Sequence, residues 1–577
     1  MSDKEKLADL FLEIAQWLEL QGENPFKIRA YETAARIFEQ LDEDPATLAR
    51  DGRLEEIPGI GQAIAAKTRE FFETGRIAYH DELKAKIPAV LFEMVKIPGL
   101  GAKKARVLYE KLGVQSIGEL EYACRENRLL ELPGFGAKTQ TKILAGIESL
   151  RRFQGRFLIS DALPVAEAIA DRLARLPGVT ATAVAGSLRR RKETVGDIDI
   201  VVGANPASSV METVATLPEA QAVIARGPTK TSVTLQNGLN VDVRLVTPAE
   251  YPSALHHFTG SKEHHIKLRG LARDQGLKIS EYGVERPDGS IMQVQDEAAL
   301  YRLLDLDYIE PELREGGDEI AAAREHRLPV LVREEQLRGA FHIHTTRSDG
   351  RDSLVQLAAA ARQRGWSYLG ISDHSRTAFY AGGLKTEAVV EQLREIAAFN
   401  AAHPDFRIFA GIESDILPDG SLDYDEAVLA GFDFVIGSVH SSFGMTEAAM
   451  TGRIVTAMQN RYLTMLGHPT GRLLLARDGY AVDLNEIIRA AAATDTMIEI
   501  NASPYRLDLD WRWCRQAKEA GVMLAINPDA HSAAELSVVD YGVGIARKGW
   551  LTADDILNTH STAAVAELLS RKRKSQQ

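Results

Sequence analysis

The stretch GSLRRRKETVGDIDIVV, residues 186–202, joins four consecutive basic side chains to two acidic ones. Ile and Val alternate with the acids after Gly196, and this pattern predicts a β-strand. Residues two apart on a strand share one face, so Asp197 and Asp199 should project together from an apolar strand. ATAVAG at 181–186 and NVDVRLV at 240–246 also predict strands, and the second of these carries Asp242.

Three carboxylates on adjacent strands would make a site for two divalent cations, the arrangement that supports phosphoryl transfer. Each acid alone is typical of a solvent-facing strand residue, but their combination with a Gly-Ser turn and a basic run is far more specific. Gly186 would let the backbone approach a triphosphate, and Ser187 would offer a hydroxyl and an amide. The arginines would neutralise phosphate charge.

The composition indicates an ordinary globular protein in several domains. At 577 residues the chain should form about three or four domains of roughly 150 residues each. Cys124 and Cys514 are far apart, which excludes a disulfide framework and favours a reducing compartment. No apolar run is long enough for a bilayer, and MSDKEKLADL has no apolar signal core. We therefore expect a soluble cytoplasmic protein, associated with the nucleoid, and no membrane contact.

A short motif occurs three times in the first part of the chain, as IPGIG at 57–61, IPGLG at 97–101 and LPGFG at 132–136. Each copy precedes a helical pattern, and the spacings of 40 and 35 residues fit a helix–turn–helix unit. One copy would be a plain turn, but three copies with Lys and Arg downstream predict binding to nucleic-acid phosphates through amides at helix starts. These segments resemble helix-hairpin-helix motifs. The candidate DNA-binding residues are Gly59, Gly61, Gly99, Gly101, Gly134 and Gly136.

Residues 1–318 resemble the family X DNA polymerases, the polymerase beta class of nucleotidyltransferases, and HFTGSKEHHIKLR at 257–269 looks like the family's substrate-binding segment. The resemblance implies a metal-binding catalytic triad, two triphosphate contacts and three residues around the incoming nucleotide. These are Asp197, Asp199 and Asp242, then Ser187 and Arg190, then Phe258, Thr259 and Gly260. Three departures concern sugar choice, fidelity and local charge rather than chemistry. His257 replaces an aromatic residue, His265 stands where Asn is common, and Arg191 replaces a common glycine.

The same resemblance raises a lyase activity in the first helical segment. Lys67 aligns with a lysine that forms a Schiff base with deoxyribose phosphate, and Lys27 and Tyr31 match nearby residues. Such a lysine must be unprotonated to react. The alternative is that Lys67 only contacts a DNA phosphate, and Ala63 and Ala66 stand where the family often has charged residues.

The chain after residue 336 places histidines and acids at the ends of short apolar segments. These segments, such as YLGIS, RIFAGI, FVIGSV and MLAIN, alternate with helical patterns, which predicts a parallel β/α barrel with its functional residues at the strand ends. Imidazole combined with carboxylate favours Zn, Mn or Fe. The candidate ligands are His342, His344, Asp349, His374, Glu413, His440, His468, Asp529 and His531.

Residues 336–570 resemble the polymerase and histidinol phosphatase (PHP) family, which implies a distorted barrel with three metal ions that hydrolyses phosphoesters. The implied ligand sets are His342, His344, Glu413 and Asp529 for one ion, Glu413, His440 and His468 for a second, and Asp349, His374 and His531 for a third. The family usually has an acid where Ala340 stands. An acid two residues before His342 would share its strand face and either hold its ring or reach a metal directly, so we expect Ala340 to weaken the metal site.

The whole chain is thus similar to bacterial family X polymerases with a C-terminal PHP domain, a multidomain α/β fold. The expected segments are 1–80 lyase-like, 81–155 DNA-binding, 156–255 α+β nucleotidyltransferase palm, 256–318 thumb-like, 319–335 linker and 336–577 PHP. We expect a gap-filling DNA repair polymerase, acting in base excision repair, whose PHP domain is a 3′–5′ exonuclease that also cleans 3′ ends.

The expected cofactors are Mg or Mn at the polymerase site and up to three Mn or Zn ions at the PHP site. The expected partners are gapped or primed DNA and deoxynucleoside triphosphates, bound by a monomer. Two alternatives stay open: a metal-dependent DNA phosphoesterase whose polymerase half mainly binds DNA, and a DNA-binding scaffold without enzymatic activity.

Overall fold

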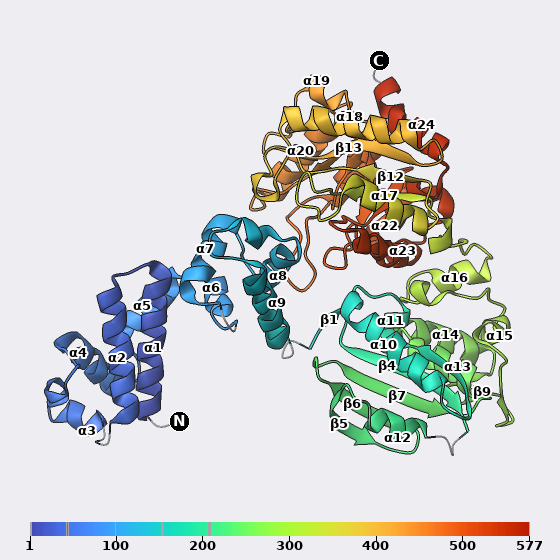
Figure 1. The fold of residues 1–577 in the computed structure, drawn as a ribbon. Coiled ribbons are helices and arrows are strands. Elements are labelled where there is room, and N and C mark those ends of the chain that lie inside the picture. Colours follow the sequence, from blue (N-terminus) through green and yellow to red (C-terminus); the bar gives the residue numbers. More distant parts are fainter. Residues whose placement is uncertain are drawn as a thin grey trace. The chain divides into compact units, whose positions relative to one another are not determined.

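The computed structural model describes residues 3–41, 43, 45–97, 100–151, 155–205 and 209–575. The chain forms two compact units, Met1–Leu150 and Arg151–Gln577 (Figure 1). In its described part, the first unit contains helices and no strands. Its elements are α1 Asp3–Gln21, α2 Pro25–Gln40, α3 Pro45–Arg50, η1 Leu54–Glu56, α4 Gln62–Thr74, α5 Ala78–Lys86, α6 Ala89–Met94, α7 Ala102–Leu112, α8 Ile117–Arg125, η2 Arg128–Glu131 and α9 Ala137–Arg151.

The three motif copies each lead directly into a helix, α4, α7 or α9, as the sequence predicted. The apolar residue between the two glycines is the anchor of each turn, because Ile60, Leu100 and Phe135 are all buried in the core of this unit. Burying this residue fixes the turn, while the helix start next to it stays at the surface.

The described glycines of these turns, Gly59, Gly61, Gly101, Gly134 and Gly136, are all exposed. The first glycine of the motif has φ +97° in Gly59 and +86° in Gly134, a backbone conformation that glycine adopts without strain. The second glycine, as in Gly61 and Gly101, caps the following helix in an extended conformation. Gly99 lies outside the described residues.

The second unit begins with a mixed five-stranded sheet in the order β2-β4-β7-β6-β5. The strands are β2 Val179–Val184, β4 Asp197–Ala204, β5 Ala220–Arg226, β6 Lys230–Leu235 and β7 Asn240–Val246, and the helices on the sheet are α10 Ile159–Ala174 and α12 Val210–Ala215. A small ribbon pairs β1 Phe157–Leu158 with β3 Thr194–Val195. The predicted strand at 181–186 was wrong at its end, because Gly186 starts the short helix α11 Gly186–Arg189.

The next segment packs around a core of its own. Its elements are α13 Tyr251–Thr259, α14 Lys262–Asp274, β8 Lys278–Ser280, β9 Gly283–Glu285, β10 Ile291–Met292, α15 Glu297–Arg302, η3 Pro311–Leu313 and α16 Glu319–Arg324. Ala323 and Leu331 share this core with Tyr301 and Leu313. Part of the expected linker at 319–335 therefore packs against the segment before it.

The last segment is a parallel sheet of seven strands in sequence order, β11 to β17. The strands are β11 Gly339–Ile343, β12 Tyr368–Ile371, β13 Arg407–Asp415, β14 Phe434–Ser438, β15 Met465–Leu466, β16 Met497–Asn501 and β17 Leu524–Asn527. Ile343 bridges Ala530, just beyond β17, so the sheet is nearly closed. This confirms the predicted barrel.

Helices surround the strands, and most of them cover the outside of the barrel (Figure 1). They are η4 Glu334–Gln336, α17 Leu354–Gln363, η5 Phe379–Ala381, α18 Thr386–Ala402, α19 Glu426–Leu429, α20 Glu447–Met458, α21 Leu484–Thr494, α22 Trp511–Glu519, η6 Ala533–Val538, α23 Val539–Lys548, η7 Ala553–Asp555, η8 Leu557–Thr559 and α24 Thr562–Ser575. One buried cluster draws a residue from every strand, so it fills the inside.

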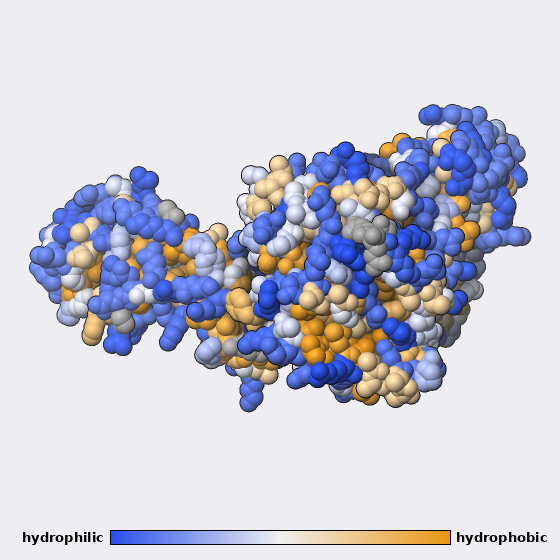
Figure 2. All heavy atoms as spheres, turned by 90° about the horizontal axis from the view of Figure 1, so that it is seen from above, coloured by the Kyte–Doolittle hydropathy of each residue, from blue (hydrophilic) through white to orange (hydrophobic). Residues whose placement is uncertain are grey.

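The face seen in Figure 2 is mainly hydrophilic, with apolar patches between charged side chains. Within the described ranges, no helix combines the length and the apolar character needed to cross a membrane.

Candidate active sites

The carboxylate site consists of Asp197, Asp199 and Asp242, on two neighbouring strands. β4 and β7 run parallel, and Asp199 stands directly opposite Asp242 in their register. Burial raises the pKa of Asp199 to about 7, and the charges of Asp197 and Asp242 add to this. Lys230 offsets only part of the negative charge, with its Nζ 2.6 Å from Asp242 Oδ2. A buried carboxylate whose pKa is raised further by two neighbouring carboxylates fits a site for divalent cations.

Gly186 leaves room for the central acid of this site. It has φ +60°, and a Cβ on it would lie 2.3 Å from Asp199 Oδ2. Any other residue would displace the carboxylate, so the glycine is required by close approach as well as by backbone conformation. Ser187 follows it, half-buried, in α11.

The basic run after Ser187 is held by acids far away in the sequence. Arg189 binds Glu297, with Nη2 2.5 Å from Oε2, and donates to Thr259 Oγ1 at 2.6 Å. Arg190 donates to the carbonyl oxygen of Thr259 and, at 3.3 Å, to Glu315. These bonds connect the basic run to the segment that carries the predicted nucleotide contacts.

Arg191 turns away from the carboxylate site. Its φ of +53° is a left-handed conformation that favours glycine, which accounts for the glycine common here in the resembling family. The side chain packs against α23, where a Cβ on Gly544 would lie 3.3 Å from Arg191 Cβ. The expectation that Arg191 adds charge near the phosphates stays a prediction.

Phe258, Thr259 and Gly260 lie at the end of α13. The Arg244 guanidinium lies 5.0 Å from the Phe258 ring centroid, and a Cβ on Gly260 would lie 2.9 Å from Arg190 Nη1. Thr259 and Gly260 are thus next to the basic run, and Phe258 lies beside Arg244.

The two histidines that depart from the family pattern contact each other. His257 Nδ1 accepts a hydrogen bond from Arg269 at 3.0 Å. His265 is buried, and its Nε2 donates to the carbonyl oxygen of His257 at 3.0 Å. Nε2 of His265 is therefore engaged by its own protein rather than presented to a base.

The histidine site collects the nine predicted ligands at the C-terminal end of the barrel strands, buried or half-buried. Glu413, inside β13, lies at its centre. Its Oε1 is 3.1 Å from Nε2 of His342, 3.2 Å from Nε2 of His440 and 3.1 Å from Nε2 of His468. Its Oε2 is 2.8 Å from His374 Nδ1. The Glu413 carboxylate therefore contacts four imidazoles.

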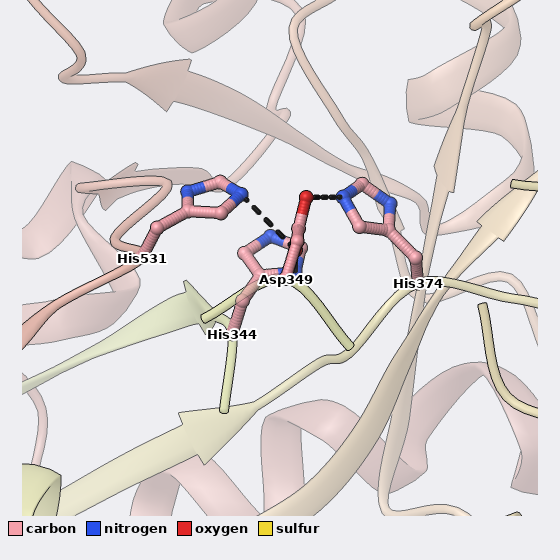
Figure 3. A group of neighbouring side chains, drawn as sticks. All are labelled: His344, Asp349, His374 and His531. Atoms are coloured by element: carbon pink, nitrogen blue, oxygen red, sulfur yellow. Dashed lines mark ion pairs between the residues drawn. The ribbon is translucent and has the colours of Figure 1, made fainter. Parts of the chain in front are cut away.

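A second part of the histidine site surrounds Asp349 (Figure 3). Asp349 lies between His374 and His531, 3.4 Å from Nε2 of each, with the His344 ring beside it. His344 Nε2 is in turn 3.4 Å from Asp529 Oδ1. The two parts of the site are thus continuous through His344, His374 and Asp529.

The donor atoms converge in four groups, each within 4.8 Å. The groups are His344, Asp349, His374 and His531; His342, Glu413 and His468; His342, His344 and Asp529; and His374, Glu413 and His440. The predicted partition into three sets differs, because His342, His344, His374 and Glu413 are shared between groups. Which residue serves which ion stays a prediction.

The electrostatics of the histidine site fit metal ions. Among the described residues, the ring nitrogens of His344 and His374 find no well-directed hydrogen bond although both rings are buried. Buried polar groups normally have such partners. Burial lowers the pKa of His344, and His531 and His374 lower it further. Burial acts in the same direction on His374, but Asp349 and Glu413 outweigh it and raise the pKa of that ring. A neutral imidazole is the form that binds metal, so His344 is ready for an ion, whereas an ion at His374 would displace a proton.

The sequence reasoning missed Glu499, which holds two of the ligands. Its Oε2 accepts from His342 Nδ1 at 2.6 Å, and its Oε1 accepts from the His468 backbone N–H at 2.9 Å. Asn501 and Asn527 each donate to it at 2.9 Å. Glu499 stands in the middle of the apolar segment MIEIN, two residues before its end, so a search for acids within the strand segments, such as Glu413, could have found it too.

The expectation for Ala340 rested on a wrong geometry. Ile343 belongs to the apolar cluster outside the barrel, and Phe341 belongs to the cluster inside it. Strict alternation after Phe341 would turn His342 outward, but its ring faces inward, to Glu413 and Glu499. His342 has φ +56° and the register shifts here, so the two-residue alternation is broken. Ala340 lies in the outer apolar cluster, and an acid there would not reach His342. Glu499 supplies the carboxylate instead.

Glu499→Gln is expected to weaken metal binding at the histidine site by about 10–100-fold, because it removes the charge that orients His342. Titrating Mn²⁺ into the wild type and the variant by calorimetry measures this. Ala340→Asp is the comparison, and it should not tighten binding. Equal affinities for the wild type and Glu499→Gln would show that this contact is only structural.

Lys67 has a partly buried, cationic environment in the first unit. Its Nζ lies 4.8 Å from the Tyr79 ring centroid, and Lys27 Nζ lies 5.4 Å from the same ring. Tyr31 is buried and stacks on Tyr79. Burial lowers the pKa of Lys67; Glu70 opposes this and Lys27 adds to it. The predicted lysine thus has features of a nucleophile.

Four family models match this chain. They are "Helix-hairpin-helix domain" at residues 2–77, "SAM-like Helix-hairpin-helix tandem" at 92–149, "DNA polymerase beta thumb" at 254–315 and "PHP domain" at 340–503. The matches fall on both units.

Similar curated proteins cover the whole chain or one of its halves. "DNA polymerase/3'-5' exonuclease PolX" of Bacillus subtilis (strain 168) is 40% identical over 571 residues, 98% of this chain and 99% of the relative. A "Probable phosphatase" of Thermoanaerobacter sp. (strain X514) is 26% identical over 250 residues, 40% of this chain and 95% of the relative. "DNA polymerase lambda" of Rattus norvegicus is 25% identical over 289 residues, 45% of this chain and 48% of the relative.

Proposed function

This chain belongs to the family X DNA polymerases that carry a C-terminal PHP domain, and on that premise we propose that it both extends and shortens DNA 3′ ends. The observation that carries the proposal is the presence of two distinct donor clusters in one unit: the carboxylate site on the mixed sheet and the histidine site on the barrel. A polymerase and a 3′–5′ exonuclease each need one such site.

Extension is assigned to the carboxylate site. Asp197, Asp199 and Asp242 would hold Mg or Mn, which when bound activates the attacking oxygen and stabilises the leaving group. Gly186, Ser187 and Arg190 would bind the triphosphate, because Gly186 lies against Asp199, Ser187 follows it in α11, and the Arg190 guanidinium lies next to Gly260. Phe258, Thr259 and Gly260 would line the nucleotide's sugar and base. Arg190 joins these two groups through Thr259.

Shortening is assigned to the histidine site. Its nine ligands would hold up to three Mn or Zn ions, which when bound polarise the phosphodiester and provide a nucleophile at neutral pH. Glu413 bridges four imidazoles, and Glu499 and Asp415 orient His342 and His440 through Nδ1, at 2.6 and 2.7 Å. This fixes which ring nitrogen faces the centre of the site.

The substrates that fit these parts are gapped or primed DNA and deoxynucleoside triphosphates. The exposed turns at Gly59, Gly61, Gly101, Gly134 and Gly136 would bind DNA phosphates without reading sequence. A role in gap-filling DNA repair, including base excision repair and 3′-end cleaning, follows from this pairing of activities. We further propose a monomer in the cytoplasm, at the nucleoid, with the segment boundaries given from the sequence.

One labelled primer on gapped DNA tests the function directly. With Mg²⁺ or Mn²⁺ we expect lengthening when nucleotides are present and shortening when they are absent. Shortening without any extension would favour a phosphoesterase whose polymerase half only binds DNA. If the protein neither lengthened nor shortened the primer, a DNA-binding scaffold without enzymatic activity would be the remaining alternative.

A second function, deoxyribose phosphate lyase, is favoured by the lowered pKa of Lys67. We expect borohydride to trap the protein covalently on gapped DNA carrying a 5′ deoxyribose phosphate, and Lys67→Ala to lose most of the trapped product. Lys27→Ala keeps the Lys67 amine but removes a charge that lowers its pKa, so it should trap less than the wild type and more than Lys67→Ala. Undiminished trapping in Lys67→Ala would assign the chemistry to another amine, and no trapping in the wild type would leave Lys67 as a phosphate contact.

A further inference from the structure

Helix α23 of the barrel packs on the basic run of the carboxylate site. A Cβ on Gly544, in this helix, would lie 3.3 to 3.4 Å from the Cβ, Cγ and Cδ of Arg191, so the helix and the run are in close contact. One residue at the end of the same helix, Lys548, reaches further into the polymerase segment. Its side chain is completely buried, with an exposed fraction of 0%.

The ammonium group of Lys548 has polar partners only from the polymerase segment among the described residues. Its Nζ donates to the backbone carbonyl oxygens of Arg190 at 3.0 Å and Glu312 at 3.3 Å, and it forms an ion pair with Glu315. The ring of Trp511, in the barrel, lies 4.8 Å away on the apolar side. A charge that has been taken out of water in this way is stable only with such partners.

Glu315 connects Lys548 to the segment that carries Thr259 and Gly260. Its Oε1 accepts from Arg190 Nε at 3.3 Å, and its Oε2 is 2.9 Å from Lys192 Nζ. Arg190 then donates to the Thr259 carbonyl oxygen, next to Gly260. Lys548 is therefore joined to the proposed nucleotide contacts through Glu315 and Arg190.

Loss of the lysine charge would change this arrangement. Glu315 would be left with two cations, and Arg190 would be drawn closer to it, since a buried carboxylate needs a partner. The Arg190 carbonyl oxygen would also lose the hydrogen bond that it accepts from Lys548 Nζ at 3.0 Å. Both changes would move the Arg190 guanidinium away from the place where we propose that it binds the triphosphate.

We propose that Lys548 is a positioning residue for nucleotide incorporation, by which the PHP barrel holds Arg190 and the Thr259–Gly260 segment in place through Glu315. The proposal rests on the polymerase function proposed above. It assigns a role in extension to a residue that lies in the barrel with the histidine site but is separate from its ligands.

Single-nucleotide insertion into gapped DNA by Lys548→Met tests it. We expect KM for the deoxynucleotide to rise about tenfold, the size of one lost hydrogen bond to a charged group, with a smaller change in kcat. Shortening by the same protein should be unchanged, which shows that the barrel is folded. Arg515→Met is the matched control, because it removes another ion pair between the segments, 2.7 Å from Asp318, without touching the basic run.

A second variant separates positioning from folding. Glu315→Gln should raise KM in the same way, and the double variant should be no worse than either single one, because both changes break the same connection. An unchanged KM in Lys548→Met, additive effects in the double variant, or equal loss of extension and shortening would each overturn the proposal. Absence of extension by the wild type would instead refute the polymerase function itself.

The pH profile gives a readout that a purely structural role would not produce. Burial lowers the pKa of Lys548 to about 8; Glu315 opposes this, and Lys192 and Arg190 add to it. KM of the wild type should therefore rise above about pH 8 as Lys548 loses its proton. Lys548→Arg keeps its charge, so its KM should stay flat over that range. The same rise in both proteins would place the titration elsewhere and overturn the proposal.

Discussion

Asp242→Asn is expected to reduce primer extension by about 10³-fold, because it removes one of three carboxylates around the proposed cations and with it several kcal/mol of charge stabilisation. The amide keeps the volume of the side chain, and Asp242 lies on a strand whose neighbours Val241 and Val243 stay in the core. Extension of a labelled primer on gapped DNA with Mg²⁺ and all four nucleotides measures the effect.

The same protein should still shorten the primer when nucleotides are withheld, since the histidine site has its own ligands. Glu219→Gln is a suitable control: it removes one negative charge from the same segment, where Glu219 pairs with Arg172 at 2.7 Å, away from the site. If Asp242→Asn lost both activities and remained folded, the assignment of two independent sites would be wrong.

The carboxylate site could be predicted because it depends on local rules. Alternation along 197–203 and 240–246 placed Asp199 and Asp242 on one face each, and strand pairing then brought them opposite each other. The partners of the basic run could not be predicted in this way. Glu297 and Glu315 lie more than 100 residues from Arg189 and Arg190, and only the fold brings them together.

In the histidine site, the sequence predicted which residues come together but not which carboxylate contacts which imidazole. A strand-end position tells only that a side chain reaches the top of the barrel. Glu413 contacts four imidazoles because of the directions in which these side chains point, and strand-end positions alone do not give those directions. The error at Ala340 has a local cause, the positive φ of His342, which breaks the alternation and which no pattern of residue types announces.

Glu413→Gln is expected to reduce 3′ shortening by about 10³-fold while leaving extension unchanged. The carboxylate is 1% exposed, and its Oε1 lies 3.1 to 3.2 Å from Nε2 of His342, His440 and His468. An amide has the same shape but no charge and only one oxygen, so it cannot bridge ions that imidazoles share, and several kcal/mol of stabilisation are lost. Release of the labelled 3′ nucleotide in Mn²⁺ measures the effect, and metal analysis of the purified variant should find fewer bound ions than in the wild type.

Glu426→Gln is the matched control, because Glu426 is an exposed acid in the same barrel, in the first turn of α19. It should shorten the primer at the wild-type rate and keep the wild-type metal content. The result for Glu413→Gln also separates this residue from Glu499, whose loss should be overcome by more Mn²⁺ because it only orients a ligand. Shortening by Glu413→Gln that returns to the wild-type rate at saturating Mn²⁺ would contradict a bridging role, since a bridging oxygen has no substitute in the site.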